Sequence, residues 1–374
     1  MSAVDTSAGS ATIDQLLDRI RPAVRAEQAY IVGAPDHVEV KLNQNESPFD
    51  VPPDLKEAIA AAAAEVPFNR YPNEQPHELR QALAEYNDVD AKSIIVGNGS
   101  NELTYTFGMA LIDPGTPVVL PTPMFSLYEK VVRLADGDLT SVPPRSDLSF
   151  DTEAIIDAIQ ASDPALTVIT SPNNPTGLAM PFGDIERIVR AADGFVVVDE
   201  AYVEFNPEGS ALRLVQDHPN VIVLRTFSKA YGLAGLRIGY LIAHPTVAHE
   251  IMKARLPFMV DRLAEITALK LIERPGLLQD RVETMRAARR DLAKALRAMD
   301  GVDVVPSHAN FVLFRTDWPA SALQAALADR GVLIRDMSGY DALAHHVRVN
   351  AGTPSENKAF LAALEDTLYD DEGA

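Results

Sequence analysis

The stretch that decides the fold is Thr226-Phe227-Ser228-Lys229-Ala230-Tyr231-Gly232-Leu233-Ala234-Gly235-Leu236-Arg237-Ile238-Gly239. Its lysine, Lys229, follows two hydroxyl residues, and Arg237 lies eight positions later among glycines. A lysine amine can form a Schiff base with an aldehyde, and hydroxyl groups and an arginine can hold a phosphate. Together they indicate pyridoxal phosphate (PLP), a cofactor that carries both groups. A single lysine in a polar loop would suggest only a surface residue, so this interpretation depends on matching features elsewhere.

Two apolar runs upstream of this stretch each end in polar residues. Leu166–Thr170 precedes Ser171-Pro172-Asn173-Asn174-Pro175-Thr176-Gly177, and Phe195–Val198 precedes Asp199-Glu200-Ala201-Tyr202. Each run is typical of a buried parallel strand, and open α/β sheets bind ligands at the carboxyl ends of such strands. Taken alone, the first polar segment is typical of a turn and the aspartate of a helix cap. Taken together, these segments predict one site that contains Asn174, Asp199, Tyr202, Lys229 and Arg237.

With these segments the chain resembles the fold-type I PLP-dependent aminotransferases of class I and II, and within them the branch that acts on histidinol phosphate. The resemblance extends from about residue 40 to the C-terminal helix. The other segments that carry it are Leu42-Asn43-Gln44-Asn45-Glu46-Ser47-Pro48, Arg70-Tyr71-Pro72, Gly97-Asn98-Gly99-Ser100-Asn101-Glu102 and His346-Val347-Arg348-Val349-Asn350-Ala351-Gly352-Thr353. It implies PLP as the cofactor, and a small-molecule amino donor and a 2-oxo acid as substrates. Histidinol phosphate and 2-oxoglutarate, in histidine biosynthesis, are the expected pair.

The resemblance also implies roles for single residues. Lys229 would hold the cofactor and move the substrate proton, and Asp199 would pair with the pyridine nitrogen. Tyr202 and Asn174 would donate hydrogen bonds to the phenolic oxygen. The expected contacts to the ring and the phosphate are completed by Ser100, Asn101, Phe125, Thr226, Ser228, Arg237 and, from a neighbouring subunit of a homodimer, Tyr71.

Two arginines near the C-terminus are candidate substrate ligands. Arg348 resembles the arginine that binds the substrate carboxylate; histidinol phosphate has no carboxylate at Cα, so there Arg348 would bind its phosphate or the dicarboxylic co-substrate. Arg335 is a second candidate anion ligand, and a salt bridge with Asp336 is an equally expected role. Asn43 is expected to line the entrance of the site. The family often has a tyrosine directly after an N-terminal Arg-Pro; here Tyr30 is the nearest candidate for that substrate contact.

Strands that alternate with helices predict an α/β fold with a mainly parallel sheet between helices, arranged as in aspartate aminotransferases by the resemblance. A smaller α+β domain is expected at the C-terminus. We expect an N-terminal arm with part of the small domain at 1–40, the large PLP-binding domain at 41–275 and the small domain at 276–374. The expected strands are residues 93–97, 118–120, 166–170, 195–199, 221–225, 238–243, 310–315, 332–335 and 347–350.

Composition excludes several other classes of function. The chain has 53 acidic and 33 basic residues and a net charge of −20, which argues against binding nucleic acid. It has no cysteine, which excludes disulfides and thiolate metal sites. The histidines are scattered, so we expect no metal. No apolar run is long enough for a membrane helix, and no signal pattern is present, so a cytoplasmic protein without membrane partners is expected.

Three alternatives remain at this point. An aromatic amino-acid aminotransferase would share most of the motifs. A PLP-dependent amino-acid phosphate decarboxylase would use the same scaffold for another reaction. A non-catalytic ligand sensor is disfavoured by the intact lysine and by the short acidic N-terminus, which has no room for a DNA-binding module.

Overall fold

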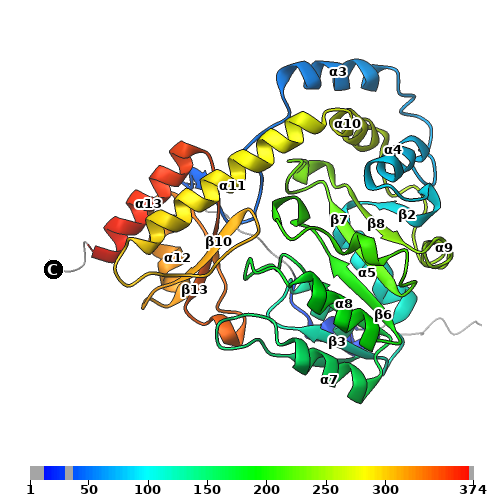
Figure 1. Ribbon diagram of the computed structural model, residues 1–374, viewed down its shortest axis with the longest axis horizontal. Helices are drawn as coiled ribbons and strands as arrows, with labels where there is room; N and C mark the ends of the chain where they lie inside the picture. Colours follow the sequence, from blue (N-terminus) through cyan, green and yellow to red (C-terminus); the bar gives the residue numbers. More distant parts are fainter. Residues whose placement is uncertain (1–11, 30–36, 370–374) are drawn as a thin grey trace, which may run out of the picture.

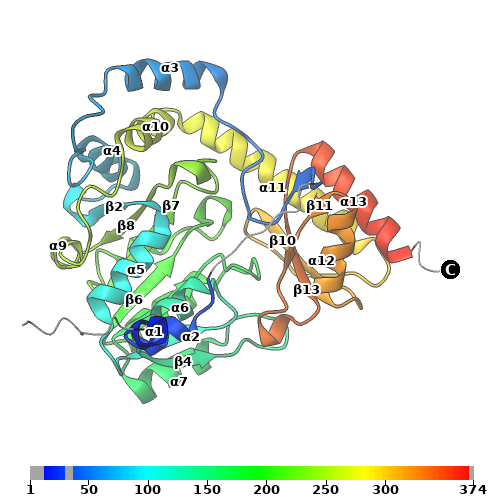
Figure 2. The same ribbon diagram turned by 180° about the vertical axis from the view of Figure 1, so that it is seen from behind.

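The computed structural model describes residues 12–29 and 37–369, which form a seven-stranded sheet, a four-stranded sheet and a two-stranded pair (Figures 1 and 2). The larger sheet has seven strands in the order β2-β8-β7-β6-β5-β3-β4. Only β8 runs antiparallel to its neighbours, and β7, β6, β5, β3 and β4 are mutually parallel. The strands are β2 (Ile94–Gly97), β3 (Pro117–Pro121), β4 (Asp138–Val142), β5 (Leu166–Thr170), β6 (Phe195–Asp199), β7 (Val221–Thr226) and β8 (Gly239–Ala243). The expected mainly parallel sheet is confirmed.

Helices cover both faces of this sheet, which explains why its central strands β5, β6 and β7 are mainly apolar and are buried along nearly their whole length. On β6, Val196 and Val198 pack into one core, and Val197 packs into the core on the opposite face. The helices around the large sheet are α3 (Pro53–Ala64), α4 (His77–Asn87), α5 (Gly99–Leu111), α6 (Leu127–Leu134), α7 (Thr152–Ser162), α8 (Phe182–Ala191), α9 (Pro245–Met252) and α10 (Arg262–Ile272). Short 3₁₀ turns connect several of them, namely η1 (Ala91–Ser93), η2 (Val203–Phe205), η3 (Ala211–Leu214) and η4 (Ala234–Leu236).

The smaller domain is a four-stranded antiparallel sheet of order β12-β13-β10-β9 with its own core. Its strands are β9 (Asp303–Val304), β10 (Phe311–Arg315), β12 (Arg335–Asp336) and β13 (His346–Asn350), and a parallel pair, β1 (Val40–Lys41) with β11 (Val332–Leu333), lies beside it. Its helices are α12 (Ala320–Asp329), α13 (Pro354–Tyr369) and the turn η5 (Asp341–Leu343). The long helix α11 (Pro275–Arg297) runs from the large sheet to the small one (Figure 1).

The N-terminal segment, expected as an arm, contains two short helices, α1 (Ile13–Leu17) and α2 (Pro22–Ala26), because Pro22 begins a new helix and Arg21 is bound to Leu134 O and Asp136 beside α6. One sequence expectation differs from the structure in detail. The expected strand 332–335 is divided between β11 and β12, which belong to different sheets. Within the described ranges, no helix is long and apolar enough to cross a membrane.

Candidate active site

A cavity of about 520 Å³ lies where the carboxyl ends of β5, β6 and β7 face the small domain. The parallel register places Thr170 opposite Asp199, and Asp199 opposite Leu224, so the segments after these strands reach the same edge of the sheet. The predicted residues that line this cavity are Asn43, Ser100, Asn101, Phe125, Asn174, Asp199, Tyr202, Thr226, Ser228, Lys229, Arg237, Arg335 and Arg348. Tyr30 lies outside the described residues, and Tyr71 does not line the cavity of its own chain.

Lys229 lies in the turn that follows β7, and its amine faces a crowded polar environment. Nζ donates a hydrogen bond to Gln44 O at 3.0 Å. Burial, together with the positive charges of Arg348 and Arg237, lowers the pKa of Lys229 from its ordinary 10.5 to about 8, against the raising effect of Glu46. An amine of this pKa can accept and return a proton near neutral pH.

Asp199 ends β6 and carries a buried carboxylate. Its Oδ1 accepts the Ala201 N–H at 3.0 Å, and its Oδ2 accepts the Tyr128 hydroxyl at 2.7 Å. Burial raises the pKa of Asp199 to about 6, against the lowering effect of these two hydrogen bonds. The Tyr128 hydroxyl remains a donor, because burial and the Asp199 charge raise its pKa well above 10. The carboxylate is therefore ionised above about pH 6 and held in one orientation.

Sequence reasoning did not assign Tyr128 to the site. It lies at the start of α6, three residues after Phe125, in a segment whose only predicted contribution was the ring-stacking aromatic side chain. Its contact depends on how α6 packs against the end of β6, which no local pattern reports. The one available signal was a second aromatic residue one helical turn after Phe125.

Tyr202 is held by the segment that follows β1. Asn45 Nδ2 donates to the Tyr202 hydroxyl at 2.9 Å, and Asn45 itself has a left-handed backbone with φ of 55°. This strained conformation is fixed from the small domain, because Asn350 Oδ1 accepts the Asn45 N–H and Asn310 Nδ2 donates to Asn45 O, both at 3.1 Å. The Tyr202 hydroxyl thus has a fixed donor on one side and remains able to donate on the other.

An anion-binding corner lies between η4, β8 and the N-terminus of α5. Arg237 Nη1 donates to Ser228 Oγ at 3.2 Å and to Ala234 O at 2.9 Å, and Thr226 Oγ1 accepts the Ser228 N–H at 3.1 Å. Arg237 is itself left-handed, with φ of 54°. A guanidinium, a hydroxyl and the free N–H groups of a helix N-terminus together suit a phosphate.

Two glycines leave the space that this corner needs. A Cβ on Gly99 would lie 2.5 Å from Arg237 Nη2, and Gly99 has φ of 74°, which disfavours any other residue. A Cβ on Gly239 would lie 2.4 Å from Ser100 N. The backbone of α5 and the arginine can therefore approach the same point, so the residues present fit a bound phosphate.

The small domain contributes two arginines from neighbouring strands. Arg335 on β12 and Arg348 on β13 are directly paired in the sheet. Arg348 is buried, donates to Asn43 O at 3.0 Å and to Asn174 Oδ1, and lies over the Phe311 ring. Both line the cavity, so the site has arginines from the small domain in addition to Arg237 and can meet more than one anion.

Tyr71 lies on a different surface. Its side chain is 84% exposed and stacks on Phe258, with ring centroids 4.9 Å apart. Phe68 and Leu256, which are close in sequence to these two rings, are 76% and 69% exposed. Large apolar side chains in such a group are typical of a contact with another protein chain.

The model of the aminotransferase class I and II family matches residues 38–364 of the chain. The histidinol-phosphate aminotransferase of Chlorobium phaeovibrioides is 43% identical over 345 residues, which cover 92% of this chain and 96% of that protein. The histidinol-phosphate aminotransferase of Chlorobium chlorochromatii is 41% identical over 362 residues, or 97% and 99% of the two chains.

Solved structures give the same result for the fold. The histidinol-phosphate aminotransferase from Sinorhizobium meliloti, in complex with pyridoxal-5'-phosphate, superposes with a TM-score of 0.85 at 26% identity and covers 94% of this chain and 98% of its own. The L-threonine-O-3-phosphate decarboxylase from Porphyromonas gingivalis has a TM-score of 0.78 at 27% identity and covers 88% and 99%.

Proposed function

The chain belongs to the class I and II aminotransferases, and we propose that it transfers the amino group of histidinol phosphate to 2-oxoglutarate with PLP as its cofactor. Two lines of support favour this substrate. The histidinol-phosphate aminotransferases are similar to the chain over nearly its full length. The observation that carries the proposal is the pair Arg335 and Arg348 on adjacent strands of the small domain, facing the cavity.

The residues present suit PLP at each of its functional groups. Arg237, Ser228 and the N-terminus of α5 would hold the phosphate. Asp199 would pair with the pyridine nitrogen, because its carboxylate is buried and is charged above about pH 6. Tyr202 and Asn174, which also line the cavity, would meet the phenolic oxygen, and Phe125 would lie against the ring.

When bound, PLP supplies an aldehyde and a ring that accepts electrons. The protein decides where the substrate proton goes. Lys229 Nζ, with a pKa of about 8, is unprotonated in roughly a tenth of molecules at pH 7 and in about half at pH 8, and it is the group that accepts the proton from substrate Cα. Asp199 keeps its charge through the reaction because Tyr128 and the Ala201 N–H fix it.

Each of the two proposed substrates brings an anion at a distance from the reacting carbon. Histidinol phosphate carries a phosphate monoester, and 2-oxoglutarate carries a second carboxylate. Arginine binds both, because its planar fork matches two oxygens of either group. An aromatic amino acid has one carboxylate and an apolar ring, and it would leave Arg335 without a substrate anion.

We also propose that the enzyme works as a homodimer in which Tyr71 reaches the phosphate corner of the partner subunit. The exposed stack of Tyr71 on Phe258, with Phe68 and Leu256 beside it in sequence, supports an interface at this surface. The position of Tyr71 outside its own cavity is what a shared site requires.

The test is a comparison of specificity constants for histidinol phosphate, phenylalanine and threonine phosphate, each with 2-oxoglutarate. Arg335→Leu is expected to lower kcat/KM for histidinol phosphate about 10- to 100-fold, which is the loss expected when one charge-assisted hydrogen bond is removed. The same change is expected to lower kcat/KM for phenylalanine far less. Arg315→Leu is the matched control, since Arg315 lies on β10 of the same sheet and pairs only with exposed Asp303. A higher kcat/KM for phenylalanine than for histidinol phosphate would contradict this proposal and indicate an aromatic amino-acid aminotransferase. Release of carbon dioxide from threonine phosphate would indicate an amino-acid phosphate decarboxylase.

A further inference from the structure

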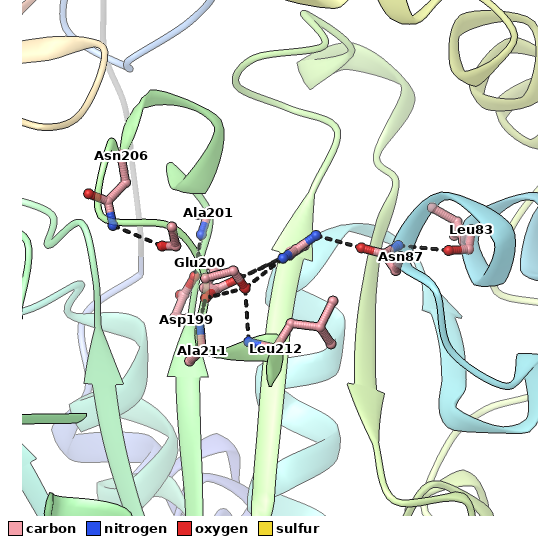
Figure 3. Close-up of polar contacts among 11 residues, drawn as sticks. Leu83, Asn87, Asp199, Glu200, Ala201, Asn206, Ala211 and Leu212 are labelled. Atoms are coloured by element: carbon pink, nitrogen blue, oxygen red, sulfur yellow. Dashed lines mark hydrogen bonds and ion pairs between the residues drawn. The ribbon is translucent and has the colours of Figure 1, made fainter. Parts of the chain in front are cut away.

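A buried ion pair between Glu200 and Arg225 lies where β6 and β7 end, next in sequence to residues that line the site (Glu200 is labelled in Figure 3). Glu200 follows Asp199 at the end of β6, and Arg225 precedes Thr226 at the end of β7. Arg225 Nε donates a hydrogen bond to Glu200 Oε2 at 3.0 Å, and Arg225 Nη2 lies 2.9 Å from the same oxygen in an ion pair. The Glu200 side chain is 2% exposed and the Arg225 side chain 9%, and neither lines the cavity. The mechanism described above uses neither of them.

The glutamate side of the pair is bound from a third element. Glu200 Oε1 accepts the Ala211 N–H at 2.6 Å, and the Ser210 hydroxyl contacts both carboxylate oxygens at 2.7–2.8 Å. Ser210 Oγ also accepts the Leu212 N–H and a bond from Arg225 Nη2. The turn η3 is therefore attached to the end of β6 through a carboxylate.

The arginine side of the pair is bound from a fourth element. Arg225 Nη1 donates to Asn87 Oδ1 at 2.6 Å, and Asn87 Nδ2 donates to Leu83 O at 2.7 Å within α4. Figure 3 shows this line of contacts from β6 across β7 to α4. All three nitrogens of the guanidinium are engaged, so its position is fixed in every direction of its plane.

The location of the pair matters because the main-chain ladder between β6 and β7 ends there. The last bond runs from the Glu200 N–H to Leu224 O at 2.8 Å. Beyond this bond, the segment that follows β6 enters η2, with Tyr202 at its start, and the segment that follows β7 enters the turn that contains Ser228 and Lys229. The Glu200–Arg225 contact is the next tie between these two segments.

Stability alone does not account for such a pair. Removing two charges from water costs about as much as their attraction returns, and apolar residues of similar volume often fold equally well or better. What an ion pair with several directional bonds supplies is a fixed geometry. A reaction that depends on the placement of Asp199 and Lys229 is sensitive to displacements of about 1 Å.

We propose that the Glu200–Arg225 pair is a positioning device that fixes the Asp199–Tyr202 segment relative to the Ser228–Lys229 turn, and so sets the geometry in which the cofactor is bound. The inference rests on the proposed function, since it assigns these segments to the cofactor. Neither residue touches the cavity, so both act through their neighbours.

The decisive comparison is between a single variant and a double variant. Arg225→Met leaves a buried carboxylate without its cation, and its Tm is expected to fall strongly. Glu200→Gln combined with Arg225→Met removes both charges, and its Tm is expected to return to within a few degrees of the original protein. Despite this recovery, the double variant is expected to bind PLP about 10- to 100-fold more weakly and to lose kcat by a similar factor, with a changed absorbance spectrum of the bound cofactor.

Two further variants make the test independent of folding. Arg225→Lys keeps the charge but replaces a fork that reaches three partners with a single amine, and it is expected to weaken PLP binding measurably at nearly unchanged Tm. Asn206→Ala is the matched control: Asn206 bonds Gly209 O and the Glu208 N–H in the same loop without touching the pair, and PLP affinity should stay within about 2-fold.

The outcomes separate this inference from the proposed function. If the unaltered protein does not bind PLP or transaminate, the proposed function fails first. If it does, while the double variant and Arg225→Lys both bind PLP and turn over as the original protein does, the pair is only structural and the inference is wrong. An equal loss in Asn206→Ala would also overturn it, because loop order would then explain the effect. If the double variant does not fold, Arg225→Lys decides between the two results.

Discussion

Replacing Lys229 with methionine is expected to stabilise the PLP-free protein at neutral pH while removing its activity. Burial lowers the pKa of this amine from 10.5 to about 8, so the folded state holds the charge less well than the unfolded chain does. At about 1.4 kcal/mol per pH unit, the charged amine costs up to about 3 kcal/mol. Part of the side chain faces the cavity, which reduces the expected gain to about 2 kcal/mol. Methionine has a similar length and no charge to bury.

The stability difference between the original protein and Lys229→Met is expected to depend on pH. Below pH 8 both states carry the proton, and the full cost is present. Between pH 8 and about 10.5 the unfolded chain binds more protons than the folded one, so the stability of the original protein rises with pH. The advantage of Lys229→Met should therefore be largest at pH 7 and should disappear towards pH 10.5.

The assay is urea unfolding of the PLP-free proteins at pH 7 and pH 10, followed by circular dichroism. Lys358→Met is the control, because Lys358 is exposed on α13 and its loss should change the free energy of unfolding by less than about 0.5 kcal/mol. If Lys229→Met is as stable as the original protein at pH 7, or less stable, the amine is not strained by burial and the argument for its lowered pKa fails.

Three other predictions follow from the site. Asp199→Asn should reduce kcat by a factor that corresponds to about 3 kcal/mol, with much less effect on PLP affinity, because a neutral amide cannot hold the ring proton; near-normal turnover would refute its role. Tyr128→Phe removes a hydrogen bond that lowers the pKa of Asp199, so the acidic limb of the pH–rate profile should move to higher pH, and an unmoved limb would remove Tyr128 from the site. Mixing inactive Tyr71→Phe chains with inactive Lys229→Ala chains should restore activity in heterodimers that contain one unaltered site, whereas sedimentation of a fully active monomer would exclude shared sites.

The parts of the fold and site that could be predicted were those recorded in short, local patterns. The apolar runs at Leu166–Thr170 and Phe195–Asp199 are typical of buried strands, and parallel strands bring their carboxyl ends together, so Asn174, Asp199 and Lys229 were predicted to share one site. The glycines around Arg237 indicated that the backbone and a ligand approach each other closely there. These inferences needed the order of the segments and no distances.

The parts that were not predictable depend on packing between distant segments. Tyr128 reaches Asp199 only because α6 lies against the end of β6. Asn45 reaches Tyr202 only because two asparagines of the small domain hold it in a left-handed conformation. Glu200 follows Asp199 in a predicted strand-end segment, but its partner Arg225 and the link to Asn87 in α4 appear only when β6, β7 and α4 are assembled. Tyr30 lies outside the described residues and stays a prediction.

The most direct test of the central claim is a single half-reaction. The PLP-loaded enzyme is mixed with histidinol phosphate in the absence of any oxo acid, and the absorbance of the bound cofactor and the released product are followed together. We expect one equivalent of the ketone of histidinol phosphate to form per subunit, 2-oxoglutarate then to restore the original absorbance with release of one glutamate, and phenylalanine to react at least about 10-fold more slowly. No absorbance change with histidinol phosphate, with a full change on adding phenylalanine, would contradict it.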